Sequence, residues 1–173
     1  MEKKTVFEGS IFTLTQEPVS IHGKEYIRDI IHHPGGVGIL AIQDEQILLV
    51  EQPRPAIGQD TLEIPAGKLE YGEDPLQAAY RELNEETGFT CKKLEPIFSF
   101  VSTPGFCDER IWLYEAIEPV LSEKRLAMDE DEQITLYHMP LSQAELYIQN
   151  GRIIDAKTIL AIQYACLKRR DSR

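Results

Sequence analysis

Cysteine is scarce in this sequence, and long apolar runs are missing from it. The three cysteines, Cys91, Cys107 and Cys166, lie far apart and form no C-x-x-C pair, so they indicate neither a disulfide framework nor a zinc site. No apolar run reaches the roughly 18 residues that a membrane-spanning helix needs, and residues 1–10 turn polar at once. We therefore expect a cytoplasmic protein with reduced thiols and without a secretory signal or membrane helix.

Positive charge is also in short supply. The chain has 18 Lys and Arg residues against 29 Asp and Glu residues, which gives a formal net charge of -11 at pH 7. Proteins that bind nucleic acid or anionic membranes rely on clustered Lys and Arg side chains, so neither partner is expected. The acidity favours bound metal cations instead.

The length of 173 residues predicts one domain, residues 1–173, with a sizeable buried core. Residues 5–21 and 24–33 mix β-branched and aromatic residues with polar ones in rough alternation, which predicts antiparallel strands. We expect an N-terminal strand section over about residues 1–34 and a core over about residues 35–173.

Short, almost wholly apolar runs at residues 37–42 and 46–52 predict two buried strands joined by a tight hairpin. The other expected elements are strands at 92–102, 110–117 and 134–139 and helices at 140–150 and 155–170, the last with Asp155 as its N-cap. Sheets and helices are segregated along the chain, as in a mixed α/β (α+β) fold. Trp112 and Tyr114 lie in a predicted strand that is expected to be buried on both faces, so both side chains should pack in the protein core.

A further helix is predicted at residues 75–87. Asp74 can cap it, Pro75 suits the first helical position, and Gly88 can take the left-handed conformation at its end. The core-facing stripe follows helical spacing and consists of Leu76, Ala79, Tyr80 and Leu83.

Three carboxylates, those of Glu82, Glu85 and Glu86, share another side of this helix. Like charges three or four residues apart destabilise a helix by about 0.2–0.5 kcal/mol per pair, and the single guanidinium of Arg81 does not neutralise all three. Hard oxygen ligands in this arrangement suit Mg²⁺ or Mn²⁺, which would in turn hold a substrate phosphate. The alternative is a solvated acidic surface.

The stretch that contains this helix resembles the Nudix box. The residues that fill the defined positions of the box are Gly67, Glu73, Arg81, Glu82, Leu83, Glu85, Glu86, Gly88 and Phe89. The resemblance implies a Nudix-type α/β/α sandwich with a mixed β-sheet. It also implies hydrolysis of a nucleoside diphosphate linked to another group, with a divalent metal held by the box glutamates.

The resemblance assigns roles around that metal. Glu82 and Glu86, then Glu85, are the expected metal ligands, together with the backbone carbonyl of Ala66. Arg81 would orient these ligands. Glu73 would brace the loop; its alternative is an acid at a helix start, where the macrodipole favours negative charge.

Residues outside the box resemble the ADP-ribose pyrophosphatase branch of the family, whose products are AMP and ribose 5-phosphate. The stretches that carry this resemblance are YIRDIIHHPGGVGIL, LLVEQPRP and FVSTPGF with Pro104. Arg54 would contact the diphosphate, since a guanidinium binds phosphate in bidentate fashion, and Glu63 would lie near the terminal ribose. Arg28 and Asp29 would recognise adenine, and Gly105 would contact substrate. The alternative for Arg54 is an ordinary surface arginine. The alternative for Arg28 and Asp29 is a pair of exposed strand residues.

The acidic run at residues 129–133 coincides with a loop that carries a catalytic glutamate in this branch. Glu130 is the expected general base, and Glu132 is the alternative base or an additional metal ligand; a box glutamate such as Glu85 also stays open. The alternative for this acidic run is a solvated loop without a catalytic role. The branch commonly exchanges N-terminal strands between subunits, which implies a homodimer whose adenine pocket includes both chains.

Other residues are predicted to be structural. His32 and His33 precede a Pro-Gly turn and have no metal-ligand partner at a recognised spacing, and Cys107 lacks a convincing base. The sequence thus predicts a Mg²⁺-dependent pyrophosphatase acting on ADP-ribose, with Mn²⁺ as a possible substitute. The alternatives are another nucleoside diphosphate sugar or dinucleotide as substrate, or a noncatalytic ADP-ribose sensor.

Overall fold

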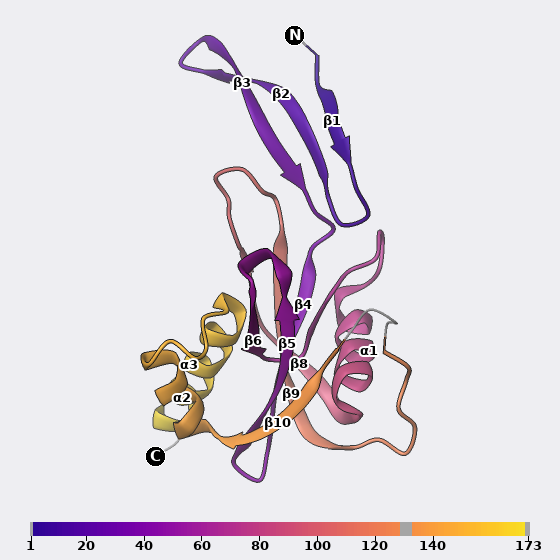
Figure 1. The fold of residues 1–173 in the computed structure, drawn as a ribbon, viewed down its shortest axis with the longest axis vertical. Coiled ribbons are helices and arrows are strands. Elements are labelled where there is room, and N and C mark those ends of the chain that lie inside the picture. The colour runs from indigo at the N-terminus through magenta and orange to yellow at the C-terminus, as the bar shows by residue number, and fades with distance from the viewer. Residues whose placement is uncertain (1, 129–132, 172–173) are drawn as a thin grey trace.

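The computed structural model describes residues 2–128 and 133–171. A mixed sheet lies between α1 (Pro75–Thr87) on one side and α2 (Leu141–Gln149) with α3 (Ala156–Asp171) on the other, and a smaller sheet extends away from it (Figure 1). The fold is an α/β/α sandwich with added N-terminal antiparallel strands, as predicted.

The smaller sheet consists of β1 (Lys4–Glu8), β2 (Thr13–Ile21) and β3 (Lys24–His32), all antiparallel. His22 and Gly23, at φ values of 51° and 75°, join β2 to β3, as in a two-residue type I′ hairpin. The end of β3 reaches the core through backbone hydrogen bonds: Ile31 N donates to Phe106 O at 2.7 Å, and Asp108 N donates to Ile31 O at 3.1 Å.

His32 strengthens the same junction. Its Nδ1 lies 2.6 Å from Asp108 Oδ2 and its Nε2 lies 2.9 Å from Glu17 Oε1. The hydrogen bond to Asp108, followed by the one to Glu17, raises the pKa of His32 above its ordinary value. These contacts fit the structural role expected for this histidine.

The larger sheet has seven strands: β4 (Gly36–Gln43), β5 (Gln46–Arg54), β6 (Gln59–Glu63), β7 (Ala66–Lys68), β8 (Phe89–Val101), β9 (Arg110–Leu121) and β10 (Thr135–Pro140). The order is β10-β5-β4-β9-β8, with β6 paired to β5 and β7 paired to β4. β4 and β9 are parallel, and the other pairs are antiparallel. Asp44 and Glu45, both at positive φ, make the tight hairpin predicted between β4 and β5.

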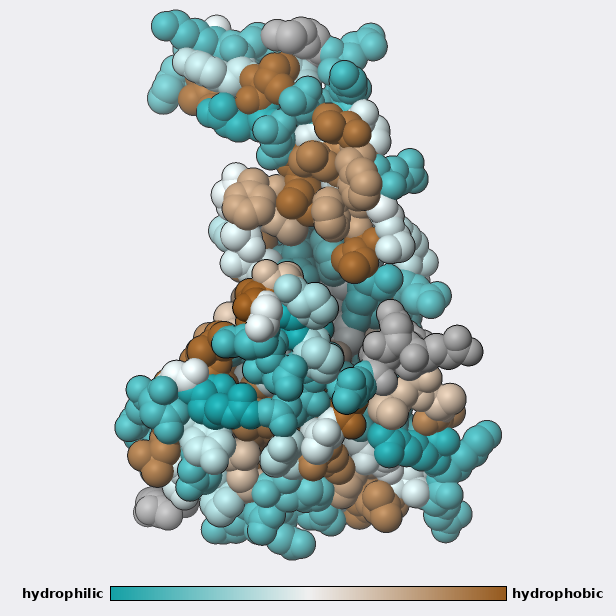
Figure 2. Space-filling view, viewed as in Figure 1, coloured by the Kyte–Doolittle hydropathy of each residue, from teal (hydrophilic) through white to brown (hydrophobic). Residues whose placement is uncertain are grey.

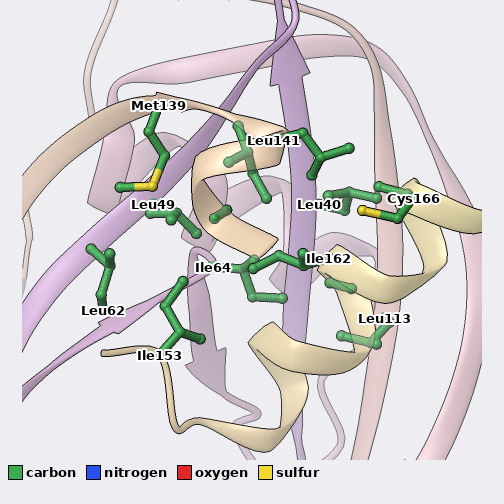
Figure 3. Close-up of a cluster of buried hydrophobic side chains, with 14 residues drawn as sticks. Leu40, Leu49, Leu62, Ile64, Leu113, Met139, Leu141, Ile153, Ile162 and Cys166 are labelled. Atoms are coloured by element: carbon green, nitrogen blue, oxygen red, sulfur yellow. The ribbon is translucent and has the colours of Figure 1, made fainter. Parts of the chain in front are cut away.

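The central strands β4 and β5 are buried on both faces, which explains their nearly continuous apolar runs. Leu40 and Leu49 pack with Ile162 in the cluster beneath α2 and α3 (Figure 3). Their chain neighbours Ile39 and Leu48 point to the opposite face and pack beneath α1. That second cluster also contains Ala79, Leu83 and Tyr114, and the partly buried Leu76, Tyr80 and Trp112 pack against it. The predicted core stripe of the helix is therefore confirmed, as is the core packing of the β9 aromatics.

Helix α1 has the predicted bounds because its end signals work locally. Asp74 Oδ1 accepts hydrogen bonds from the backbone N–H groups of Leu76 and Gln77, each at 3.1 Å. Gly88 ends the helix at φ 75° and donates its N–H to Asn84 O.

Two other local predictions also hold: Asp155 Oδ2 caps α3 by accepting from Thr158 N, and the three cysteines are free. None of the described helices combines the length and apolar character needed to cross a membrane.

The cap at Asp74 leads to the first prediction. Asp74→Ala should lower the free energy of unfolding by about 1 kcal/mol, because two N–H groups lose their acceptor. Urea unfolding at pH 7 measures the change, and Asp74→Ser, which keeps an acceptor, should stay within a few tenths of the wild type. Equal stability of the alanine variant and the wild type would contradict the capping role.

Candidate active site

Strand β7 and helix α1 place two box carboxylates against one stretch of backbone. Ala66 N donates to Glu86 Oε2 at 2.8 Å, and a Cβ added at Gly67 would lie 1.9 Å from the Cδ atom of Glu82. Glu86 is 1% exposed and Glu82 is 6% exposed. The alternative of a solvated acidic surface is therefore wrong for these two residues, and only glycine permits so close an approach at position 67.

Arg81 connects the remaining acids of the box. Its Nε and Nη2 atoms donate to the two oxygens of Glu73, each at 3.1 Å. Its Nη1 atom lies 2.6 Å from Glu82 Oε1 and 2.9 Å from Glu85 Oε2. Glu73 Oε2 also accepts from Glu70 N at 3.0 Å, so Glu73 ties the loop before α1 to the helix.

The opposite charges in this group shift the pKa values of Arg81 and Glu73. Burial acts to lower the pKa of Arg81, but the hydrogen bond to Glu73 and the carboxylates of Glu82 and Glu85 raise it above the ordinary arginine value. The hydrogen bond from Arg81 in turn lowers the pKa of Glu73. Arg81 is thus a permanent cation that holds three carboxylates in a defined arrangement.

The donor set fits a hard divalent cation. The carboxylates are those of Glu82, Glu85 and Glu86, which lie on about one turn of α1, and Ala66 lies next to them through its N–H bond to Glu86. Oxygen donors of this kind are what Mg²⁺ prefers. Within residues 2–128 and 133–171, no three His, Cys, Asp or Glu side chains already converge as a metal-ligand group; Arg81 pairs with Glu82 and Glu85. Metal binding by these glutamates accordingly stays a prediction.

A second charged group borders the box. Arg54, at the end of β5, donates through Nε and Nη2 to the two oxygens of Glu63, at 2.7 Å each. Thr61 and Lys157 also donate to this carboxylate. The group lines a cavity of about 410 Å³, whose walls are Arg54, Ala56, Ile57, Thr61, Glu63, Ile154, Asp155 and Lys157.

The electrostatics of this group are strong. Burial acts to raise the pKa of Glu63, but the hydrogen bond from Arg54 and the charge and hydrogen bond of Lys157 outweigh it and lower the pKa to about 2. The hydrogen bond to Glu63 raises the pKa of Arg54, and the negative charges of Asp155 and Glu86 add to that effect. Glu63, which holds Arg54, lies only three residues before Ala66, whose N–H donates to Glu86 of the box.

Lys157 is the residue that sequence reasoning missed. It lies 94 residues from Glu63 along the chain, on an element that the box does not include. One signal was available: a lysine in the first turn of a helix opposes the macrodipole, which favours negative charge there. Such a placement needs a compensating acid, and the fold supplies Glu63 and Asp155.

Three other predicted substrate-binding residues, Arg28, Asp29 and Gly105, do not line this cavity in the described part of the chain. Arg28 and Asp29 lie on β3 in the smaller sheet, where the guanidinium of Arg28 lies over Tyr26 and Asp29 accepts from Gln16. Gly105 lies in the loop between β8 and β9, and a Cβ there would meet no described atom within 4 Å.

Glu130 and Glu132 lie outside the described residues. The segment that leads to them is attached to the C-terminal end of α1. Arg125 donates to the backbone carbonyls of Glu85 and Glu86, and Leu126 N donates to Asn84 Oδ1 at 2.7 Å. This part of the chain therefore runs alongside the helical turn that carries the box glutamates.

Known proteins are similar to this chain in sequence and in fold. The NUDIX domain family model matches residues 32–160. The chain is 42% identical to the methanol dehydrogenase activator of Bacillus methanolicus, over 97% of this chain and 92% of that protein. It is also 42% identical to the ADP-ribose pyrophosphatase of Bacillus subtilis (strain 168), over 96% and 91%. The crystal structure of an ADP compounds hydrolase covers 99% of this chain and 94% of that one with a TM-score of 0.85 at 19% sequence identity, which supports the fold.

The low pKa of Glu63 gives a pH-dependent prediction. Its pKa falls from an ordinary value of 4.5 to about 2 in the fold, so its pairing stabilises the protein fully above pH 4.5 and is lost as the pH falls towards 2. The loss sums to roughly 3 kcal/mol. Urea unfolding at several pH values should show Glu63→Gln most destabilising at pH 7 and much less so at pH 3.

The control is Glu118→Gln, because that carboxylate pairs with Lys92 at an exposed site and should contribute little at any pH. A Glu63→Gln effect of the same size at pH 7 and pH 3 would show that the charge of Glu63 does not stabilise the fold.

Proposed function

This chain belongs to the NUDIX family, and on that premise we propose that it hydrolyses the pyrophosphate bond of ADP-ribose to give AMP and ribose 5-phosphate. One observation carries the proposal: Arg54 and Glu63 line a cavity of about 410 Å³, and Ala66, three residues after Glu63, donates its N–H to Glu86 on the oxygen-rich face of α1. The 42% identity to an ADP-ribose pyrophosphatase supports this substrate.

Mg²⁺ is the proposed metal, and Glu82, Glu85, Glu86 and the carbonyl of Ala66 would hold it. When bound, such an ion neutralises phosphate oxygens and lowers the pKa of a water molecule. The chain's own part is to keep the ligands in place: Arg81 orients Glu82 and Glu85, and the N–H of Ala66 holds Glu86.

Arg54 is the proposed ligand of the diphosphate. Glu63 occupies its Nε and Nη2 atoms, and within the described chain its Nη1 atom has no hydrogen-bond partner, so N–H groups remain for phosphate oxygens. Glu63 and Gly105 are proposed to contact the rest of the substrate. Glu130 is the proposed general base, with Glu132 and Glu85 as alternatives.

A homodimer would bring the missing adenine contacts to the site. Hydrophobic side chains gather on and just below the smaller sheet on the face shown in Figure 2, and Phe7 and Ile27 are 51% and 39% exposed. The strand registers place these two side chains on one face of the sheet. We infer that a second copy covers this face and that Arg28 and Asp29 of one chain serve the cavity of the other.

The substrate and the metal face can be tested together. The wild type and Glu86→Gln are assayed with Mg²⁺ on a panel of substrates: ADP-ribose, other ADP-sugars, GDP-mannose, NADH and diadenosine polyphosphates. ADP-ribose should give AMP with the highest kcat/KM, and Glu86→Gln should lose at least about 100-fold, because even supporting residues of metal ligands cost 10- to 100-fold. Mg²⁺ should also raise the Tm of the wild type more than that of the variant.

Glu70→Gln is the matched control, because Glu70 is an exposed acid of the same segment and should leave both readouts unchanged. If another compound gives the highest kcat/KM, the assignment of ADP-ribose as substrate is wrong, but metal-dependent pyrophosphate hydrolysis still holds. If no compound is turned over, a binding sensor becomes the better account.

The dimer proposal predicts a mass in light scattering of twice the 19.7 kDa chain. Phe7→Asp combined with Ile27→Asp should give monomers and a higher KM for ADP-ribose, because charges on an apolar interface oppose association. Leu167→Asp, at a 57% exposed leucine of α3, should stay dimeric. A monomeric wild type with full activity would refute this arrangement.

A further inference from the structure

Lys157 has no role in the function proposed above, yet it is one of the most enclosed cations of the described chain. Its side chain is 14% exposed, and its Nζ atom contacts Glu63 Oε2 and lies 3.1 Å from Asp155 Oδ1. It also lines the cavity next to Arg54. A lysine that gives up so much hydration needs compensating interactions of this strength.

Glu63 is the link between Lys157 and Arg54. One oxygen of this carboxylate accepts from Arg54 Nε and Thr61 Oγ1, and the other accepts from Arg54 Nη2 and Lys157 Nζ. The Arg54 side chain is 41% exposed, whereas that of Glu63 is 3% exposed. The long arginine side chain therefore depends on a buried acid for its orientation, and the buried acid depends on Lys157 and Thr61.

The position of Lys157 is itself set by the start of α3. Asp155 Oδ2 accepts from Thr158 N at 2.9 Å and from Thr158 Oγ1 at 2.6 Å. Thr158 Oγ1 accepts in turn from Ile64 N at 2.8 Å, the residue that follows Glu63. This chain of hydrogen bonds fixes the first turn of α3 against the end of β6, so Lys157 meets Glu63 from a rigid support.

A cation in the first turn of a helix is unfavourable for the macrodipole. Departures from a local preference of this kind are expected at functional sites. The cavity wall beside Arg54 is such a location.

We propose that Lys157 is a positioning residue: by holding Glu63, it fixes the guanidinium of Arg54 in the orientation that binds the diphosphate of the substrate. The inference rests on the proposed function through the role of Arg54. Lys157 acts through Glu63, which leaves the remaining N–H groups of Arg54 in one geometry for phosphate oxygens.

The test compares Lys157→Met, which keeps the length but loses the charge, with Lys157→Arg, which keeps the charge. Both are measured below the Tm of every variant, with Mg²⁺. Lys157→Met should raise KM for ADP-ribose roughly tenfold, a coupling typical of residues in contact. Its kcat and its Mg²⁺ activation curve should change less than about twofold, and Lys157→Arg should recover most of the loss in KM.

A second arm does not need turnover. Calorimetry with inorganic pyrophosphate and Mg²⁺ should give a similar, roughly tenfold weaker affinity for Lys157→Met. In a Glu63→Gln background, Lys157→Met should add little to either loss, because the residue through which it acts is already changed.

Three results would overturn the inference. The first is a Lys157→Met variant with a lower Tm but unchanged KM and pyrophosphate affinity, which would make the lysine structural. The second is full additivity with Glu63→Gln, which would mean that Lys157 does not act through that residue. The third is an Arg54→Met variant that binds pyrophosphate as well as the wild type. If ADP-ribose is not hydrolysed at all, the proposed substrate fails while the pyrophosphate arm still decides the role of Lys157.

Discussion

The contact between the backbone of β7 and the carboxylates of α1 is the constraint on which the site depends. Gly67 has no side chain, so the strand approaches until a Cβ would lie 1.9 Å from the Cδ atom of Glu82. Glu86 is held by the N–H of Ala66 in the same place. The apolar side of the helix packs in the core through Ala79 and Leu83. This packing keeps the buried Glu82 and Glu86 next to β7.

Every buried carboxylate in this region has a specific partner, which is what a low-dielectric environment demands. Arg81 joins Glu73, Glu82 and Glu85 in one group, and Arg54 with Lys157 holds Glu63 in another. The chain carries a formal charge of -11, but in the site charges alternate in sign over short distances. This alternation orients the carboxylates and the guanidinium groups through specific ion pairs.

Elements with strong local signals were predicted well. Helix α1 begins at Pro75 and ends at Thr87 as expected, because a capping aspartate, a proline and a glycine act within a few residues of one another. The apolar runs of β4 and β5 were equally well predicted, since burial on both faces leaves no polar positions. The tight hairpin between them was also expected, and the structure shows it as a two-residue turn. The box residues followed from a pattern along one continuous stretch of chain.

The partners of those residues could not be read in the same way. The sequence by itself determined the order of the longer elements, the bounds of α1, the acids at Glu82, Glu85 and Glu86, and the need for a cation to balance them, because these depend on neighbours three or four positions away. It did not predict the short strands β6 and β7, which form by pairing with β5 and β4. Only the tertiary structure decided that Arg54 and Lys157 share Glu63, and that β3 holds Arg28 and Asp29 away from the cavity of their own chain. Such pairings join segments as much as 94 residues apart, and they are set by the packing of α3 against the sheet.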